Sequence, residues 1–538
     1  MPRSNNNDDA AMLFNSYLFL LVFLPITLAV HYAVGSVSLR LAALWLCITS
    51  IVFYGWWNPQ FVVLLSGSIA FNYIVSQIIL SLGSRPKLQL LVTGLGVAGD
   101  LALLFYYKYF TALLGFLHGM GMGSGGPIDD ILLPLGISFF TFTQIGYLLD
   151  CRAGVVNERS LLSYVLFVTF FPHLIAGPIL HHKEMMPQFA QRDNYRFRSE
   201  NLSIGGMLFL IGLTKKVVLA DSIAPYADAG FAEPGSLQFW AAWGASMSYA
   251  LQLYFDFSGY SDMALGLAKM FGIRFPLNFN SPYKATSIID FWARWHITLT
   301  RYLTAYLYYP VAMAVSRWRT DRGKPVGAAG VATAGGFAST IVLPTVFTMG
   351  LAGIWHGAGL QYLVFGLLHA GYLSINHAWR IFVVGRQAAV SRNPGRLAKI
   401  FYLLLTFAAV LVAQAFFRAH STADAWLLVQ GMMGLRGFEG METFSYLSGV
   451  SFADGWRMLA GRHIQLLYVI VLLAIVWFTP NAHQIMGRYS PALVRPNPAP
   501  TPWMRWRPNL AWLGVMLLML ALCLLNLHKE TRFLYFQF

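Results

Sequence analysis

Charged residues are scarce in this sequence. Only 11% of its 538 residues are Asp, Glu, Lys or Arg, whereas 57% are hydrophobic, and the mean hydropathy is +0.56. A soluble globule of this length needs more polar surface than these residues can supply. The composition therefore excludes a soluble protein and predicts a chain whose solvent is a lipid bilayer.

Cysteines are also few. Cys47, Cys151 and Cys523 are widely scattered, and each lies in or beside an apolar window. Secreted domains that are stabilised by disulfides have more cysteines, at shorter spacings. Cysteine usage therefore excludes a disulfide framework and gives no information about the redox compartment.

Signatures of common hydrolases are missing as well. The sequence has no G-x-S-x-G nucleophile elbow, no H-E-x-x-H metal helix and no P-loop. His181, His182 and Glu184 form a polar cluster after Pro178, but their spacing does not match that of a typical zinc site. We therefore expect no bound metal.

Positive charge exceeds negative charge, with 37 Lys and Arg against 22 Asp and Glu and a net charge of +15. In a soluble protein this balance would suggest nucleic acid as a partner. In a membrane protein it indicates cytoplasmic loops that face anionic lipid. We expect membrane lipid as a partner and no nucleic acid.

Long apolar windows are what the sequence has in abundance. A helix of roughly 20 apolar residues crosses the hydrocarbon core of a bilayer, and we expect ten or more such helices. The windows lie near residues 16–34, 39–55, 60–81, 88–117, 202–223, 237–255, 338–381, 399–417, 464–479 and 509–527. The sequence therefore predicts an all-α, multi-pass membrane protein.

Two further apolar segments, 133–150 and 171–180, are interrupted by Pro and Gly. Broken helices persist at membrane depth only inside protein or beside a water-filled cavity. These segments predict broken or re-entrant helices near a buried site.

Polar and aromatic residues concentrate in the stretch 254–310. If residues 288–306 form one helix, Asp290 and Arg294 are four residues apart and can pair, and Arg294 and Arg301 lie two turns apart. One face of that helix carries Trp292, His296 and Thr300. The pattern suits a channel for an anionic, ring-bearing ligand, but an interfacial helix with aromatic anchors and snorkelling arginines has the same pattern.

A second polar feature is His356, which lies in an apolar span. The glycines around it are Gly350, Gly353, Gly357 and Gly359, and small residues let neighbouring helices come close. A buried neutral histidine can take a proton from a hydroxyl as a general base. The alternative is a histidine that only packs and bonds to a backbone carbonyl. His369 and His377 are expected to be structural.

At these residues the sequence resembles the membrane-bound O-acyltransferase family, in particular the bacterial branch with the alginate O-acetylation membrane subunit and the teichoic acid D-alanylation membrane protein. Blocks similar to the family's occur in family order along essentially the whole chain. They include FYGWWNP (53–59), LPLGISFFTFTQIGYLLD (133–150), FFPHLIAGPI (170–179), YFDFSGYSDMALGLAKMFGIRFPLNFNSPY (254–283), DFWARWHITLTRYL (290–303) and GIWHGAG (353–359). The chain departs from the family pattern at His181 and His182, where a basic or aromatic pair is expected.

The resemblance implies the family's fold, a ring of tilted transmembrane helices with re-entrant or broken helices around a central tunnel. We accordingly expect a single membrane domain over residues 1–538. It would have N-terminal spans at 16–117, a catalytic core at about 130–380 and C-terminal spans at 399–527. The location implied is the inner membrane of a bacterium.

The resemblance also implies which residues are catalytic and which line the tunnel. His356 matches the family's essential histidine, and His296 matches the second histidine that lines the tunnel. Residues expected to line the tunnel or contact substrate are Trp292, Arg294, Trp295, Arg301, Trp355, Asp256 and Asn278. No tightly bound cofactor is expected, and acetyl-CoA or another acyl thioester would be the donor substrate.

The activity that the resemblance implies is transfer of an acyl group, acetyl by likeness to the exopolysaccharide branch, from a cytoplasmic thioester across the membrane to a hydroxyl. The acceptor would be an alginate- or cellulose-like exopolysaccharide, or a periplasmic acetyltransferase partner. Three alternatives stay open: teichoic acid D-alanylation-type transfer, a transporter, and a structural subunit of a polysaccharide secretion complex. Transporters often have two related halves, and no such pairing is evident in this sequence.

Overall fold

The computed structural model describes residues 12–122, 131–385, 395–438, 462–494, 498–527 and residue 534. Every regular element within these ranges is a helix, which confirms the predicted all-α class. The chain divides into two compact units, and each is described by itself. The first comprises Met1–Val217, Gly259–Leu277 and Ala482–Thr531, and the second comprises Val218–Ser258, Asn278–Asn481 and Arg532–Phe538.

Several helices have the length and apolar composition needed to cross a membrane. Within the described ranges, five long ones are Gln60–Ser81, Pro86–Lys108, Ser199–Ala232, Ala334–His356 and Arg396–Arg418. Five shorter apolar helices are Phe19–Gly35, Leu39–Gly55, Phe110–Gly119, Ile464–Phe478 and Leu510–Asn526. Many large apolar side chains on these helices are exposed, and lipid chains rather than water suit such surfaces. The helices support the predicted multi-pass membrane protein.

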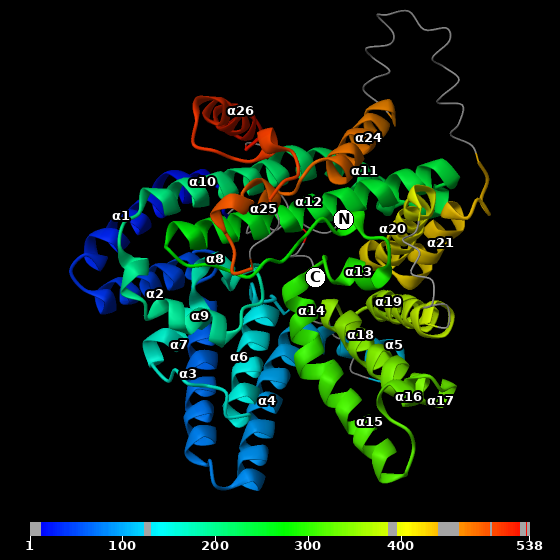
Figure 1. Ribbon diagram of the computed structural model, residues 1–538, viewed down its shortest axis with the longest axis horizontal. Helices are drawn as coiled ribbons and strands as arrows, with labels where there is room; N and C mark the ends of the chain where they lie inside the picture. Colours follow the sequence, from blue (N-terminus) through cyan, green and yellow to red (C-terminus); the bar gives the residue numbers. More distant parts are fainter. Residues whose placement is uncertain are drawn as a thin grey trace, which may run out of the picture. The chain divides into compact units, whose positions relative to one another are not determined.

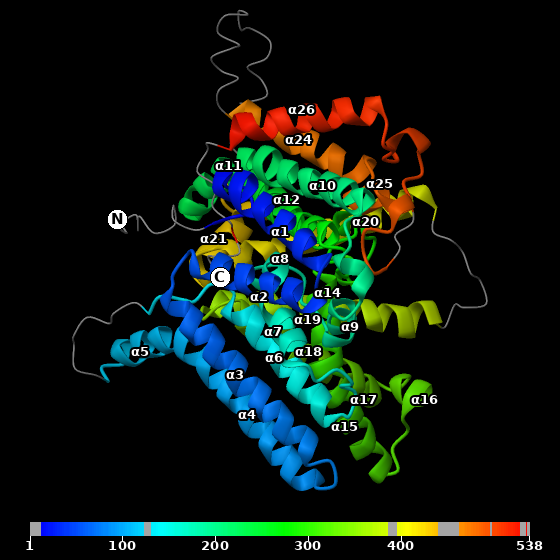
Figure 2. The same ribbon diagram turned by 90° about the vertical axis from the view of Figure 1, so that its left-hand side faces the viewer.

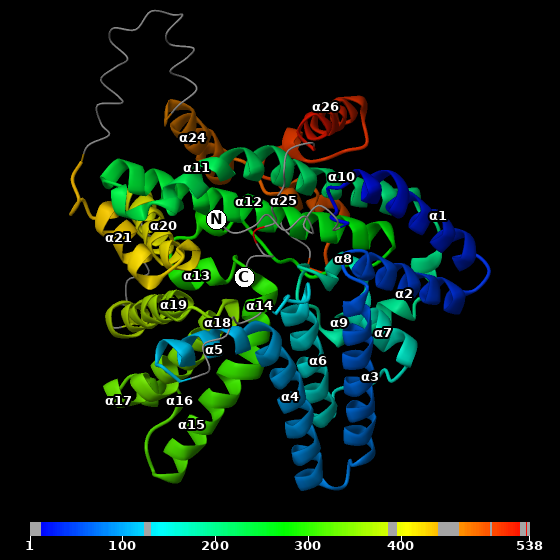
Figure 3. The same cartoon turned by 180° about the vertical axis from the view of Figure 1, so that it is seen from behind.

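The first unit begins with a π-helical turn, Phe19–Phe23, that continues into α1 (Leu24–Gly35). Its other helices are α2 (Leu39–Gly55), α3 (Gln60–Ser81), α4 (Pro86–Lys108), α5 (Phe110–Gly119), α6 (Ile137–Arg152), α7 (Leu161–Thr169), α8 (Phe171–Leu174), α9 (His182–Phe189), α10 (Ser199–Thr214), α25 (Ala482–Ile485) and α26 (Leu510–Asn526). Helices α3, α4 and α6 lie side by side (Figure 1), α26 lies along α10 (Figure 2), and α1 packs on α2 (Figure 3).

Buried polar side chains in this unit bond to one another across its helices. The amide nitrogen of Asn72 donates to Asp100 Oδ1 at 2.7 Å, which links α3 to α4. Gln144 on α6 donates to Ser68 Oγ at 2.8 Å and accepts from the Tyr164 hydroxyl at 3.2 Å. Because polar groups in an apolar medium need internal partners, these bonds fix how α3, α4, α6 and α7 pack.

Two predicted boundaries in the first unit were wrong. The window 88–117 is two helices, because α4 ends at Lys108 and α5 begins at Phe110. The segment 133–150 is less broken than expected, since its left-handed glycine, Gly136 with φ +71°, precedes α6 rather than interrupting it. The segment 171–180 is broken as predicted, with only the four-residue α8.

The second unit contains α11 (Asp221–Ala232) and the first part of α12 (Phe239–Met270). Its other helices are α13 (Ile288–Trp292), α14 (Ile297–Leu303), α15 (Tyr309–Asp321), α16 (Gly327–Val331), α17 (Ala334–Phe337), α18 (Leu343–His356), α19 (Leu360–Ala378), α20 (Arg396–Arg418), α21 (Thr422–Met432) and α24 (Arg462–Phe478). Helix α19 packs against α18, α20 and α13 (Figures 1 and 3).

Residues 288–306 do not form one helix. Helix α13 ends at Trp292, and α14 begins only at Ile297, after His296 adopts a left-handed backbone conformation. A π-helical turn, Thr304–Tyr308, then follows α14. The window 338–381 is likewise two helices, α18 and α19, separated after His356. Both breaks place a histidine at the end of a helix.

Close packing of α18 and α19 depends on two glycines. A Cβ on Gly353 would lie 2.3 Å from the carbonyl oxygen of Tyr362, and one on Gly366 would lie 2.2 Å from that of Met349. Any larger side chain would force the helices apart, since such distances are far below van der Waals contact. The predicted close approach at this glycine-rich span is confirmed.

Candidate active site

The second unit encloses a narrow cavity with mostly aromatic walls. Its volume is about 30 Å³, which is space for roughly two water-sized groups. The lining residues are Leu253, Phe257, Phe291, Trp292, Trp295, His296, Leu299, His356, Phe365, His369, Gln414 and Phe417. Three of these, His296, His356 and His369, carry imidazole rings that can donate or accept a hydrogen bond. The cavity thus brings together the two histidines singled out in the sequence and adds a third.

His356 is the last residue of α18, and its ring lies among aromatic rings. The ring of Phe417 meets it edge-on at 4.9 Å between centroids, and the ring of Phe365 does so at 5.9 Å. Gly357, which ends the helix, is required here because a Cβ would lie 2.2 Å from the ring of Tyr362. The histidine is therefore held in a largely water-free environment, where hydrogen bonds are stronger than in water.

His296 has a strained backbone, with φ +42° and ψ +52°. A left-handed conformation costs a non-glycine residue on the order of 1–2 kcal/mol and persists only where the surroundings enforce it. Asn278 enforces it here. Its carbonyl oxygen accepts from Ile297 N at 2.9 Å, and its side-chain oxygen accepts from Thr298 N at 3.3 Å and from Thr298 Oγ1 at 2.8 Å.

These bonds also set which nitrogen of His296 carries the proton. A backbone N–H can only donate, so the Asn278 atom that faces Thr298 N is the oxygen Oδ1 and not the amide nitrogen. His296 Nδ1 lies 3.1 Å from that same oxygen and must therefore donate to it. The neutral ring then has its lone pair on Nε2, which is the form that can accept a proton.

His369, for which the sequence favoured a structural role, lies on the cavity wall. The indole nitrogen of Trp292 donates to His369 Nδ1 at 3.2 Å. An indole N–H only donates, so the neutral His369 ring carries its proton on Nε2, the opposite arrangement to that of His296. Phe365 and His369 are four residues apart on α19 and therefore lie on the same face of that helix. This spacing could have indicated that both residues line one cavity.

Only some of the residues that were predicted to line the tunnel line the cavity. Trp292 and Trp295 line the cavity, and Trp355 is buried with its ring 4.8 Å from that of His356. Asn278 acts on His296 rather than lining the wall. Asp256 is buried, and its Oδ2 accepts from the backbone nitrogen of Leu534 at 3.2 Å.

The two predicted arginines lie elsewhere. Arg294 pairs with Asp290 at 2.8 Å, as the spacing predicted, and Arg301 is exposed. Neither contributes to the cavity wall. Because the helix breaks after Trp292, Arg294 and Arg301 do not lie two turns apart on one helix.

Comparison with known proteins gives one family match and several relatives. The family model of the membrane-bound O-acyltransferase family matches residues 130–320. A peptidoglycan O-acetyltransferase of Helicobacter pylori is 38% identical over 79% of this chain and 80% of its own length. A protein named probable alginate O-acetylase in Pseudomonas putida is 33% identical over 98% of this chain and 100% of its own length. A teichoic acid D-alanyltransferase of Bacillus subtilis is 27% identical over 45% of this chain and 59% of its own length.

Proposed function

Because the chain belongs to the membrane-bound O-acyltransferase family and is thus a multi-pass membrane acyltransferase, we propose that it transfers an acetyl group from a thioester to a hydroxyl of a polysaccharide. The observation that carries this proposal is that His296 and His356 both line one aromatic cavity. A space for roughly two water-sized groups suits an acetyl group better than a long acyl chain.

His356 is the proposed general base. It takes the proton of the acceptor hydroxyl while the hydroxyl oxygen attacks the carbonyl carbon of the thioester. A carbon–oxygen bond forms, the carbon–sulfur bond breaks, and the leaving thiolate takes the proton from the imidazolium. General base catalysis contributes typically 10²–10⁴-fold, and holding both reactants together contributes more.

The other two histidines have complementary proposed roles. His296 presents the lone pair of Nε2 and can accept a hydrogen bond from the acceptor hydroxyl, which orients it for attack. His369 carries its proton on Nε2 and can donate to the negative charge that develops on the carbonyl oxygen. The indoles of Trp292 and Trp295 exclude water from the reacting groups.

The substrates and the location are proposed from the resemblance and the relatives. The donor is acetyl-CoA or another acyl thioester on the cytoplasmic side of the inner membrane of a bacterium, with no tightly bound cofactor. The acceptor is an alginate- or cellulose-like exopolysaccharide, peptidoglycan, or a periplasmic acetyltransferase partner that passes the group on. The names of the Helicobacter and Pseudomonas relatives support acetyl transfer to a polysaccharide. The D-alanyl relative covers less of the chain, so D-alanyl transfer is the weaker candidate.

Replacing His356 with Ala tests the proposal. The variant is produced in a host that lacks its own copy, its membrane level is matched to that of the parent protein, and ester-linked acetate on the isolated polysaccharides is measured. We expect the ester to be lost while polymer secretion is unchanged. His377→Ala is a matched control, since His377 lies on α19 but not on the cavity wall.

Two results would contradict the proposal. Normal ester content in His356→Ala would show that this histidine only packs. Loss of secreted polymer, rather than of its acetylation, would favour a transport role instead.

A further inference from the structure

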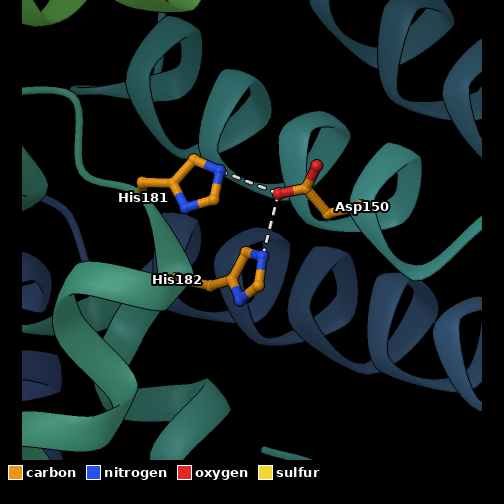
Figure 4. Close-up of side chains that lie close together, drawn as sticks. All are labelled: Asp150, His181 and His182. Carbon is orange, nitrogen blue, oxygen red and sulfur yellow. Dashed lines mark hydrogen bonds and ion pairs between the residues drawn. The ribbon is translucent and has the colours of Figure 1, made fainter. Parts of the chain in front are cut away.

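Two histidines that are adjacent in the sequence converge on one carboxylate oxygen in the first unit. Nε2 of His181 and Nε2 of His182 each lie 2.8 Å from Oδ2 of Asp150 (Figure 4). Asp150 belongs to the last turns of α6, whereas His181 directly precedes α9 and His182 begins it. The three side chains therefore join two helices that are separated in sequence by the broken segment 171–180.

A change of backbone conformation brings the two rings to the same side. Consecutive side chains of an extended chain point in opposite directions. His181 is extended, with φ −105° and ψ 136°, but His182 is already helical. The chain turns between them, and the ring centroids come within 4.6 Å of each other, with 31° between the ring planes. Both rings then face Asp150 (Figure 4).

Two imidazole nitrogens and one carboxylate oxygen form a ligand set for a divalent transition metal. The three ligand atoms lie within 4.8 Å of one another, and among the residues that the structure describes this is the one cluster of His, Cys, Asp and Glu with such convergence. Bonds of about 2.0–2.2 Å to a tetrahedral ion separate its ligand atoms by roughly 3.3 Å. To hold the ion, the two 2.8 Å distances to Asp150 would lengthen by about half an ångström, and the two ring nitrogens, which lie within 4.8 Å of each other, would come closer by up to about 1.5 Å.

We propose that Asp150, His181 and His182 bind one divalent transition-metal ion of the Zn²⁺ class. The exposed fractions of the side chains fit such a site, with 5% for His182, 12% for Asp150 and 30% for His181. The ion can enter beside His181, and a water molecule can take the fourth position on that side. The rings of Tyr147 and Phe167 pack edge-on against His182 and hold its orientation.

Hydrogen bonds within the cluster oppose metal binding, because Nε2 of each histidine must give up its bond to Asp150 Oδ2 before it can coordinate an ion. His181 Nδ1 accepts from the backbone nitrogen of Lys183 at 3.3 Å, so the proton of the neutral ring is on Nε2. Coordination through Nε2 requires that proton to move to Nδ1, which breaks this bond. The bond is long, and the N–H of Lys183 lies in the first turn of α9, where solvent can take over as acceptor. The loss of the Lys183 bond is therefore a small contribution against metal binding.

The site corrects the grouping made from the sequence. In the sequence, the two histidines neighbour Glu184, and the spacing of these three residues does not match a typical zinc site. The structure supplies Asp150 instead, from a different helix. The cavity of the second unit is a separate feature, so this metal is proposed as structural, with no part in acyl transfer.

The test measures metal directly. The full chain is purified in detergent, treated with a chelator, loaded with Zn²⁺ alone, desalted and analysed for zinc by mass spectrometry. We expect one zinc per chain, and a thermal transition that rises on loading and falls again with chelator. Co²⁺ in place of Zn²⁺ should give the visible absorption of a four-coordinate site with nitrogen and oxygen ligands.

Asp150→Asn and His182→Gln should each lose the retained zinc, since both replacements can still form hydrogen bonds but bind metal weakly. His118→Gln is the matched control, because His118 lies on α5 outside the cluster. The proposal is overturned if the parent protein retains no zinc after desalting, or if the variants retain as much as the control. Measurements on the parent protein decide the question even where a variant fails to fold, and neither result depends on acyl transfer.

Discussion

Asn278 holds the ring of His296 in one orientation, with 3.1 Å between Asn278 Oδ1 and His296 Nδ1. The same oxygen accepts from both the backbone nitrogen and the hydroxyl of Thr298. One side chain therefore fixes the left-handed turn at His296 and also the nitrogen that carries its proton. The proposed role of His296 therefore depends on a residue 18 positions earlier in the sequence.

Asn278→Ala should lower the turnover number by about 10- to 100-fold, less than the roughly 10²–10⁴-fold that general acid–base catalysis contributes, because the His296 ring stays in the cavity wall but is no longer held where it orients the acceptor hydroxyl. Asn278→Asp keeps an acceptor oxygen and should retain more activity than the alanine variant. Steady-state rates of acetyl transfer by detergent-purified protein would show the effect in kcat rather than KM. Wild-type kcat in Asn278→Ala would rule out this positioning role.

Trp292→Phe should lower the rate of acetyl transfer several-fold. The change keeps an aromatic ring in the wall but removes the N–H that bonds to His369 Nδ1, so the His369 ring is free to take the other tautomer. Trp295→Phe is the matched control, since it also exchanges an indole of the cavity wall for a smaller ring. Equal rates in the two variants would show that only ring size matters and that His369 has no oriented role.

Sequence patterns predicted where apolar helices lie, because apolar length identifies a membrane span, but they did not show that the windows 88–117 and 338–381 each hold two helices. They also identified His356 and His296, which lie in distinctive motifs. What they missed depends on contacts between distant residues. The helix break at His296 is imposed by Asn278. The orientation of the His369 ring depends on Trp292, 77 residues away, and the partner of His181 is Asp150 on another helix. Contacts between residues so far apart in the sequence cannot be predicted from the periodicity of apolar residues within one segment.

Gly353→Ala should destabilise the protein by about 1–3 kcal/mol, the usual effect of overpacking. The added Cβ would lie 2.3 Å from the Tyr362 carbonyl oxygen and would push α18 away from α19. Gly350→Ala, one turn earlier, is a matched control, since its Cβ would make only ordinary contacts at 3.9 Å. Thermal unfolding in detergent should separate the two variants, and identical transitions would contradict the close packing.

Asp262 joins two basic side chains inside the first unit. Lys215 Nζ lies 2.6 Å from its Oδ2, and His483 Nε2 lies 2.9 Å from its Oδ1. Asp262→Ala should cost about 3–5 kcal/mol of stability, because it leaves the buried ammonium of Lys215 without its counter-charge. The double change Lys215→Met with Asp262→Leu removes both charges and fills the space, so it should unfold at a higher temperature than Asp262→Ala. If the double variant is the less stable of the two, the penalty comes from lost packing, and the buried ion pair does not explain it.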